Sequence, residues 1–404
     1  MKKLLLLGLL ILFVGCPTTE INSARIYIER GEYQRAKEQV LIGLKNDPSN
    51  YELYCLLAKA EIGLLHWTEV SVAFLDAIKA DSLSAVKWIL KDTKNIGVYW
   101  QAFYNAAVAL EMEKKYEAAL ADLELCELID PSKVNVYILR GGIYAAMGKK
   151  ENASNAYAKA LSLDPENPQV YYLVGKAFFD KKEYDSALVK FDAAIKNYDK
   201  KYKAVAKVVF QNLPEIDKLL AQKIVKLWVA ENNDELDQLI KVKLGFDGGL
   251  AAYQKNIDSF YKTTLGLAMA YYLAGISQYN LKNNDAALSY IMKSLDLMPD
   301  DVDALFYAGE LHVRANKFEE ALAYFERVTK IKEDALYSWF YIGVIKMQLK
   351  DYKKAIDILE GKVLVLNPKF VDALNNLAFC YREIGNTKKA LEYLQKAEKI
   401  QKEQ

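Results

Sequence analysis

Residues 134–167 read VNVYILRGGIYAAMGKKENASNAYAKALSLDPEN, and the next 34 residues repeat the pattern. The matching positions carry aromatic or small side chains: Tyr137 and Tyr171, Gly141 and Gly175, Tyr144 and Phe178, Ala153 and Ala187, Tyr157 and Phe191, and Ala160 and Ala194. A fixed period of this length is the signature of an architecture built from stacked repeats.

The pattern resembles the tetratricopeptide repeat (TPR) family, whose unit is a pair of helices with small residues at the crossing and aromatic residues between the helices. The spacing indicates about nine such units, at 17–50, 51–84, 100–133, 134–167, 168–201, 268–301, 302–335, 336–370 and 371–404. The unit at 336–370 carries one extra residue. The resemblance implies an all-α solenoid in which helix pairs wind into a right-handed superhelix with a concave groove.

Two segments interrupt the period and divide the expected arrays. We expect an amino-terminal array at 17–201 with a short helical insertion at 85–99, an irregular helical insertion or linker at 202–267, and a carboxy-terminal array at 268–404. In the longer segment, Pro214 suits the first turn of a helix capped near Asn212. The segment fits either degenerate helical hairpins that keep the solenoid continuous or a hinge or docking element, and the sequence leaves both open.

Composition supports helices and excludes some classes of partner. Among 404 residues there are 8 Pro and 19 Gly, which disfavours turn-rich β folds, and 52% of the residues are hydrophobic, enough for a sizeable core. The formal net charge is +1, with 54 basic and 53 acidic residues. A near-neutral chain offers no electrostatic basis for nucleic-acid binding, so we expect none.

The first residues have the layout of an export signal. Two lysines precede an apolar run at 4–14 that is too short for a comfortable membrane span, and the sequence Leu12-Phe13-Val14-Gly15-Cys16 resembles the lipobox of bacterial lipoproteins. We expect a signal peptide at 1–15, cleavage before Cys16, lipidation of that cysteine and anchoring in the cell envelope. Pro17, in place of a retention-type Asp, favours the periplasmic face of an outer membrane over the inner membrane.

Residues able to carry out catalysis are sparse. Cys55, Cys126 and Cys380 are widely separated and form no CxxC pair, which argues against a metal or redox site. The two histidines, His66 and His312, have no orienting partner that the sequence reveals, and His312 occupies a place that is aromatic in other units. We therefore expect no metal, no cofactor and no enzymatic activity.

The resemblance places a protein-binding groove on the first helix of each unit, where ligand-facing residues recur at i, i+3, i+7 and i+10. This spacing selects the aromatic residues Tyr104, Tyr172, Phe179, Tyr272, Tyr279, Phe306, Tyr337 and Phe340. By resemblance to bacterial TPR lipoproteins, we expect a membrane-anchored scaffold that binds other envelope proteins or peptide segments. The alternative is a ligand-binding or transporter-accessory protein that encloses a small apolar molecule between the two arrays. The sequence does not indicate an oligomeric state.

Overall fold

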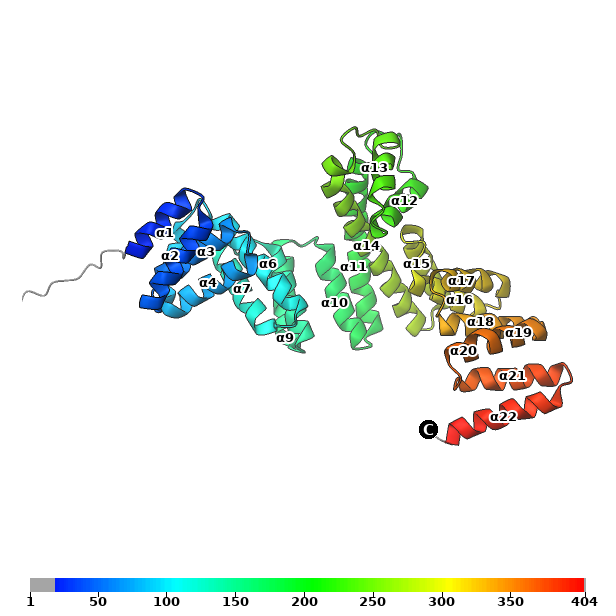
Figure 1. Cartoon of the computed structure of the whole chain (residues 1–404). Coiled ribbons are helices and arrows are strands. Elements are labelled where there is room, and N and C mark those ends of the chain that lie inside the picture. Colours follow the sequence, from blue (N-terminus) through cyan, green and yellow to red (C-terminus); the bar gives the residue numbers. More distant parts are fainter. Residues whose placement is uncertain (1–18, 403–404) are drawn as a thin grey trace, which may run out of the picture. The chain divides into compact units, whose positions relative to one another are not determined.

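The computed structural model describes residues 19–402, and they form helices joined by short turns, with no strand among them (Figure 1). The expected all-α helical-repeat fold is confirmed. The chain divides into two compact units, one ending at Pro165 and the other beginning at Glu166. The division is not at the predicted boundary after residue 201, because the helix that contains residue 201 packs along a helix of the later repeats.

The first unit contains four helix pairs and one inserted helix. Its helices are α1 (Thr19–Glu29), α2 (Tyr33–Asn46), α3 (Tyr51–Gly63), α4 (Trp67–Ala80), α5 (Ser82–Lys91), α6 (Ile96–Met112), α7 (Tyr116–Ile129), α8 (Val134–Ala146) and α9 (Lys150–Leu163). The pairs are α1–α2, α3–α4, α6–α7 and α8–α9. Helix α5 overlaps the first part of the short insertion predicted at 85–99, whose last residues lie in α6.

The second unit continues the pairs and carries a protruding helical module. Its helices are α10 (Pro168–Asp180), α11 (Tyr184–Val209), α12 (Lys218–Val229), α13 (Asn233–Val242), α14 (Gly249–Asn280), α15 (Asn284–Leu297), α16 (Val302–Arg314), α17 (Phe318–Ile331), α18 (Leu336–Gln348), α19 (Tyr352–Ile358), α20 (Leu364–Leu366), α21 (Val371–Glu383) and α22 (Thr387–Lys402). A π-helical turn at Leu359–Val363 joins α19 to α20. No helix among residues 19–402 is long and apolar enough to cross a bilayer.

Backbone geometry shows the same repeat register as the sequence. The turn between the two helices of each pair contains a residue with positive φ: Gly31, Leu65, Lys114, Gly148, Lys182, Lys282, Asn316, Lys350 and Gly385. Within uninterrupted stretches these residues are 34 positions apart, except for the last two, which are 35 apart. The extra residue is absorbed by the π-helical turn, since a π turn accommodates one more residue than an α turn.

Small residues let the helices of a pair approach closely. A Cβ atom added at Gly141 would collide with the ring of Tyr157, and one added at Gly175 would collide with the ring of Phe191. Gly275, Gly309 and Gly343 face Ile291, Phe325 and Leu359 in the same way. In each case the large residue follows the glycine by 16 positions and is fully or almost fully buried, so this contact fixes the crossing of each pair.

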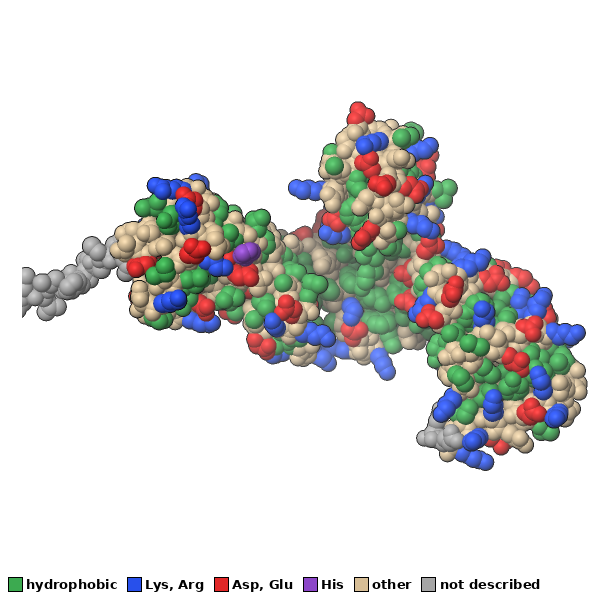
Figure 2. All heavy atoms as spheres, viewed as in Figure 1, with side chains coloured by type: hydrophobic (Ala, Val, Ile, Leu, Met, Phe, Trp, Pro, Cys, Tyr) green, Lys and Arg blue, Asp and Glu red, His purple; other side chains and the backbone are tan. Residues whose placement is uncertain are grey.

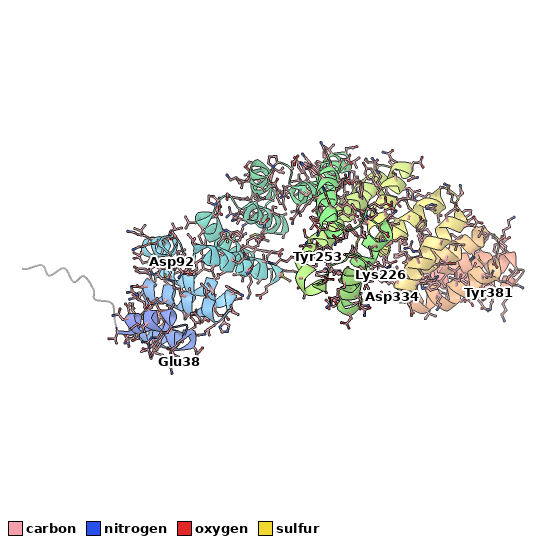
Figure 3. All side chains as sticks on the ribbon, turned by 90° about the horizontal axis from the view of Figure 1, so that it is seen from above. Glu38, Asp92, Lys226, Tyr253, Asp334 and Tyr381 are labelled. Carbon is pink, nitrogen blue, oxygen red and sulfur yellow. The ribbon has the colours of Figure 1, made fainter. Side chains whose placement is uncertain are left out.

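The inserted helix α5 packs against the first helices of neighbouring pairs in the first unit. The ammonium group of Lys59 on α3 lies over the ring of Trp88, 4.8 Å from the ring centroid. The Trp88 ring also stacks on the ring of Tyr99 of α6. Asp92, which follows α5, pairs with Lys59 at 2.6 Å and accepts a hydrogen bond from the hydroxyl of Tyr99 at 2.5 Å. Figure 3 labels Asp92 together with Glu38 of α2 in this unit.

Burial acts to raise the pKa of Asp92. Hydrogen bonds from Lys59, Tyr99 and Asn95 outweigh the effect of burial, and the pKa is lowered to about 2. An ionised Asp92 therefore holds α5 against α3 and α6, the helices on which a groove was expected.

The predicted insertion at 202–267 is built largely from extensions of the flanking repeat helices. Helix α11 runs through position 201 and α14 runs through position 267, and the two helices pair along the unit. Helices α12 and α13 form a hairpin at their far end (Figure 1). Phe260, Ile224, Leu236 and Ile240 are fully buried at the centre of this module. The repeats stay continuous through the contact of α11 with α14.

The predicted helix start at Asn212 and Pro214 was wrong. Helix α12 begins at Lys218, and the carboxylate of Asp217 accepts hydrogen bonds from the backbone N–H groups of Leu219 and Leu220. The side chain of Asn212 instead donates a hydrogen bond to the carbonyl of Leu244 at 2.9 Å. Asn and Asp are comparable N-cap residues, so local sequence alone did not decide between them.

Candidate binding surface

A continuous chain of aromatic rings runs along the first helices of three successive pairs in the second unit. We call it the aromatic ladder. Its members are Tyr272 and Tyr279 of α14, Phe306 and Tyr307 of α16, Tyr337, Phe340 and Tyr341 of α18, and Phe370 just before α21. Five of these eight residues were predicted as groove residues.

The rings of the ladder meet edge to face. Tyr307 contacts both tyrosines of α14, with centroid distances of 6.2 Å to Tyr272 and 5.3 Å to Tyr279. Phe306 contacts Tyr341 at 5.7 Å, and Phe340 contacts Phe370 at 4.9 Å. Edge-to-face pairs are favourable beyond the area they bury, so the ladder is a preorganised surface.

The ladder is partly exposed to solvent and carries tyrosine hydroxyl groups that can bind a ligand. Tyr337 is 60% exposed, and the other members are half-buried. The hydroxyls of Tyr272, Tyr307, Tyr337 and Tyr341 make no hydrogen bond to another residue in the described part of the chain. Burial raises the pKa of the Tyr307 and Tyr341 hydroxyls, so both hydroxyls stay protonated at neutral pH and can donate hydrogen bonds. The surface therefore combines apolar area with available hydroxyl groups.

The charged groups beside Tyr279 neutralise each other. The hydroxyl of Tyr279 donates to the carboxylate of Glu310, and the guanidinium of Arg314 pairs with the same carboxylate at 3.0 Å and lies over the Tyr279 ring at 4.1 Å. On the face seen in Figure 2, acidic and basic side chains are interspersed along each unit. The charges beside Tyr279 therefore compensate each other, whereas Asp303, whose charge acts on Tyr272 and Tyr307, has no ion-pair partner among the described residues.

Three predicted groove residues do not belong to the ladder. Tyr172 and Phe179 of α10 pack around the buried Phe191 of α11, at centroid distances of 6.1 and 6.5 Å. Tyr104 lies in the first unit, where its ring stacks on Trp100 at 5.1 Å. Phe306 of the ladder contacts the buried Phe325 in the same way, at 5.6 Å, but no ring contact joins Tyr172, Phe179 or Tyr104 to the ladder within the described residues.

The spacing argument missed three ladder residues. Tyr307 and Tyr341 are 34 positions apart and each directly follows a predicted residue, so the repeat itself contained the signal. Phe370 lies outside the first helix, in the turn before α21, where a helical periodicity has no power to predict it.

The histidines have partners that the sequence did not reveal. Nδ1 of His66 lies 2.9 Å from a carboxylate oxygen of the buried Glu61, whose other oxygen pairs with Lys37 at 2.8 Å. The prediction that His66 has no orienting partner was therefore wrong. The contact joins Glu61, near the end of α3, to His66, which lies in the turn just before α4. His312, at a place that is aromatic in other units, is buried, and its Nδ1 lies 2.7 Å from the carbonyl of Ala308.

Two remaining predictions concern other groups. Cys55, Cys126 and Cys380 are free thiols buried in the helices, and no cluster of potential metal ligands occurs among residues 19–402. Cys16, the predicted lipidation site, lies outside the described residues, as does the predicted signal peptide.

Comparisons with protein families agree with the repeat geometry. The family described as "TPR repeat" matches residues 141–182, and the family described as "Tetratricopeptide repeat" matches residues 361–392. Between them, residues 280–362 match "Anaphase-promoting complex, cyclosome, subunit 3". The chain is a tetratricopeptide repeat protein. TPR repeats imply a scaffold for protein–protein interaction.

The TPR chain also resembles curated proteins over part of its length. It is 23% identical over 229 residues to the TPR repeat-containing protein MJ1428 of Methanocaldococcus jannaschii, covering 55% of this chain and 35% of that protein. It is 22% identical over 189 residues to the BBSome complex member BBS4 of Bos taurus, covering 41% and 36%. A UDP-N-acetylglucosamine–peptide N-acetylglucosaminyltransferase of Giardia intestinalis is 28% identical over 87 residues, covering 22% of this chain and 6% of that protein. The TPR chain thus spans little more than a third of these relatives at most.

Solved structures show similar arrangements of helices. A structure titled as the functional characterization of pilF from Pseudomonas aeruginosa matches with a TM-score of 0.45 and 14% identity, covering 67% of this chain and 93% of that one. YrrB, titled as a TPR protein with an unusual peptide-binding site, matches with a TM-score of 0.41 and 17% identity, covering 62% and 95%.

Proposed function

We propose that this TPR protein binds a segment of another protein on the aromatic ladder and acts without catalysis. The observation that carries the proposal is the ladder itself, a run of preorganised, half-buried rings across three first helices with free hydroxyl groups at their edges. Tyrosine and phenylalanine provide large contact areas at small entropic cost, and free hydroxyls can bond the backbone of an extended segment. In the first unit the corresponding side is occupied in part by α5.

The paired charges beside the ladder suggest the character of the partner segment. Because Glu310 and Arg314 satisfy each other, a charged side chain docked there would lose its hydration without gaining a free counter-charge. Beside this pair the segment that fits is therefore apolar or aromatic, whereas next to Tyr272 and Tyr307 the unpaired Asp303 can receive a donor group or a positive charge.

A binding experiment tests this use of the ladder. Membranes carrying the tagged protein are solubilised, and captured proteins are compared with those of a variant carrying Tyr307→Ala, Tyr337→Ala and Phe340→Ala. Loss of central aromatic contacts typically costs about 2 kcal/mol or more each, so recovery of the partner should fall at least about tenfold. Circular dichroism checks that the variant remains helical.

Tyr290→Ala is the matched control, because Tyr290 lies on α15 of the same unit, outside the ladder, and donates its hydroxyl to Asp192 at 2.7 Å. This variant should retain the partner. If the ladder variant and the control recover the same proteins as the wild type, the ladder is not the docking surface.

We further propose that a lipid on Cys16 tethers the protein to the cell envelope, with the outer membrane favoured. The lipobox-like sequence at 12–16 and the residue Pro17 support this proposal. Such an anchor would restrict the protein to a membrane surface and so raise its effective concentration near partners there. Replacing Cys16 with serine should move the protein from the membrane fraction to the soluble fraction, because an acylated cysteine supplies the stable attachment. A variant that remains with the membrane at wild-type level would refute the tether.

A further inference from the structure

A pocket of about 350 Å³ lies where the helical module meets the repeats of the second unit. Five elements contribute to it: α11, the segment that leads into α12, α12 itself, α14 and α15. The volume lies within the range of small-molecule sites, which begins at roughly 300 Å³. None of the predicted groove residues lines this pocket.

The floor of the pocket is aromatic and rigid. Phe260 is fully buried, and its ring contacts Tyr202 and Phe210 at the same centroid distance of 5.6 Å. Ala221 of α12, which is 5% exposed, and Leu297 of α15 add aliphatic surface. Because these residues come from helices that pack in one core, the floor exists before any ligand arrives.

Every charged side chain that lines the pocket already has a partner of opposite charge. Lys203 pairs with Asp199 at 2.6 Å along α11. Lys218 of α12 pairs with Asp296 of α15 at 2.7 Å, and the side chain of Gln222 donates to the Asp296 carbonyl at 2.7 Å. These contacts hold α12 against α15 and leave no unbalanced charge to attract an ion.

One polar group of the lining is unengaged. The hydroxyl of Tyr202 makes no hydrogen bond to another residue in the described part of the chain, whereas that of Thr264 donates to the Phe260 carbonyl at 2.8 Å. A ligand that brings one hydrogen-bonding group would satisfy Tyr202 without disturbing either ion pair.

We propose that this pocket binds a neutral, flat, apolar small molecule that packs on Tyr202 and Leu297, in front of the buried Phe260, and exchanges one hydrogen bond with the Tyr202 hydroxyl. The site is separate from the aromatic ladder and is independent of the partner segment proposed above. It places small-molecule binding within the second unit, at the base of its module.

Fluorescence titration with N-phenyl-1-naphthylamine, a neutral aromatic amine, tests the proposal on the purified full chain. We expect saturable binding at one site per chain. Ala221→Leu, which fills the floor, and Ile216→Trp, which fills the pocket from its exposed edge, should each weaken binding at least about tenfold, since the probe loses its buried contact area. Tyr202→Phe should weaken it roughly threefold to tenfold through the lost hydrogen bond.

Two comparisons make the assignment specific. Phe340→Ala, on the ladder, should bind the probe as the wild type does. The anionic probe 1-anilinonaphthalene-8-sulfonate should bind at least about tenfold more weakly than the neutral one, because no free positive charge lines the pocket. The proposal is overturned if the neutral probe shows no saturable binding, or if Ile216→Trp and a folded Ala221→Leu both bind it at wild-type affinity. Equal or tighter binding of the anionic probe would overturn the neutral ligand class.

Discussion

Replacing Gly141 with alanine will destabilise the first unit, whereas the same replacement at Gly142 will stabilise it. The added methyl group at Gly141 would lie within 2.9 Å of Cζ of Tyr157 and closer still to two other ring carbons. Tyr157 is buried, so its ring must displace other core groups. Overpacking of this kind costs about 1–3 kcal/mol. At Gly142 no atom outside its own stretch of helix lies within 4 Å of the methyl position, so only the helix-propensity gain of about 0.5–1 kcal/mol remains.

The measurement is the thermal midpoint followed by circular dichroism, together with hydrogen exchange of the amides of α8 and α9. For a unit of this size, 1 kcal/mol corresponds to roughly 2–4 °C. Faster exchange in Gly141→Ala and slower exchange in Gly142→Ala is the expected result. A shift of both variants in the same direction would show that the contact of Gly141 with Tyr157 does not control the helix crossing.

The repeat register could be predicted because helix crossing imposes the same chemical demand in every unit. A small residue must face a large one 16 positions later, and this demand is visible as the recurring Gly141, Gly175, Gly275, Gly309 and Gly343. The extents of α11 and α14 could not be predicted in the same way. No Pro lies near residue 201 or 267, and Gly266 does not end α14 but packs against the ring of Tyr198 on α11, so the helices continue beyond the repeat and only tertiary packing shows that they do.

The candidate surface was predicted in part, for a related reason. A fixed helical spacing identifies positions on one face but does not identify which rings meet across helices. Ring contacts of Tyr307 and Tyr341 connect the predicted residues into the ladder. Tyr172 instead packs against the buried ring of Phe191. Contacts that join distant segments, such as Glu61 with Lys37, or Ser71 with Asp122, leave no periodic trace in the sequence at all.

The contact of Ser71 with Asp122 leads to a pH-dependent stability of the first unit. Asp122 of α7 is fully buried, and its Oδ1 accepts a hydrogen bond from the Ser71 hydroxyl of α4 at 2.5 Å. Its Oδ2 has no hydrogen-bond partner within the described residues. Burial raises the pKa of Asp122 to about 7, an effect that the Ser71 hydrogen bond only partly offsets.

The direction of this pH dependence follows from whether the folded or the unfolded state holds the proton on Asp122. Between the ordinary pKa of 3.8 and about 7, the folded chain retains a proton that the unfolded chain has released. Stability conferred by the protonated carboxyl is therefore complete below about pH 4 and is lost as the pH rises to about 7. Because one pKa unit corresponds to about 1.4 kcal/mol, the ionised group costs the folded state about 2–4 kcal/mol at pH 8. Asp122→Asn should accordingly raise the free energy of unfolding of the first unit at pH 8 and change it little at pH 4.

Urea unfolding at pH 4, 6 and 8, with hydrogen exchange of α4 and α7 read in parallel, distinguishes this effect from a general one. Asp76→Asn is the matched control on α4, since Asp76 pairs with Lys79 at 2.8 Å on the surface, where such pairs contribute little. It should change the free energy of unfolding by less than about 0.5 kcal/mol at every pH. Ser71→Ala removes the one donor to the carboxylate, so it should cost more at pH 8 than at pH 4. A pH-independent gain in Asp122→Asn, or a loss at pH 8, would mean that the buried carboxylate finds compensation and that α4 and α7 are not held by a neutral Asp122.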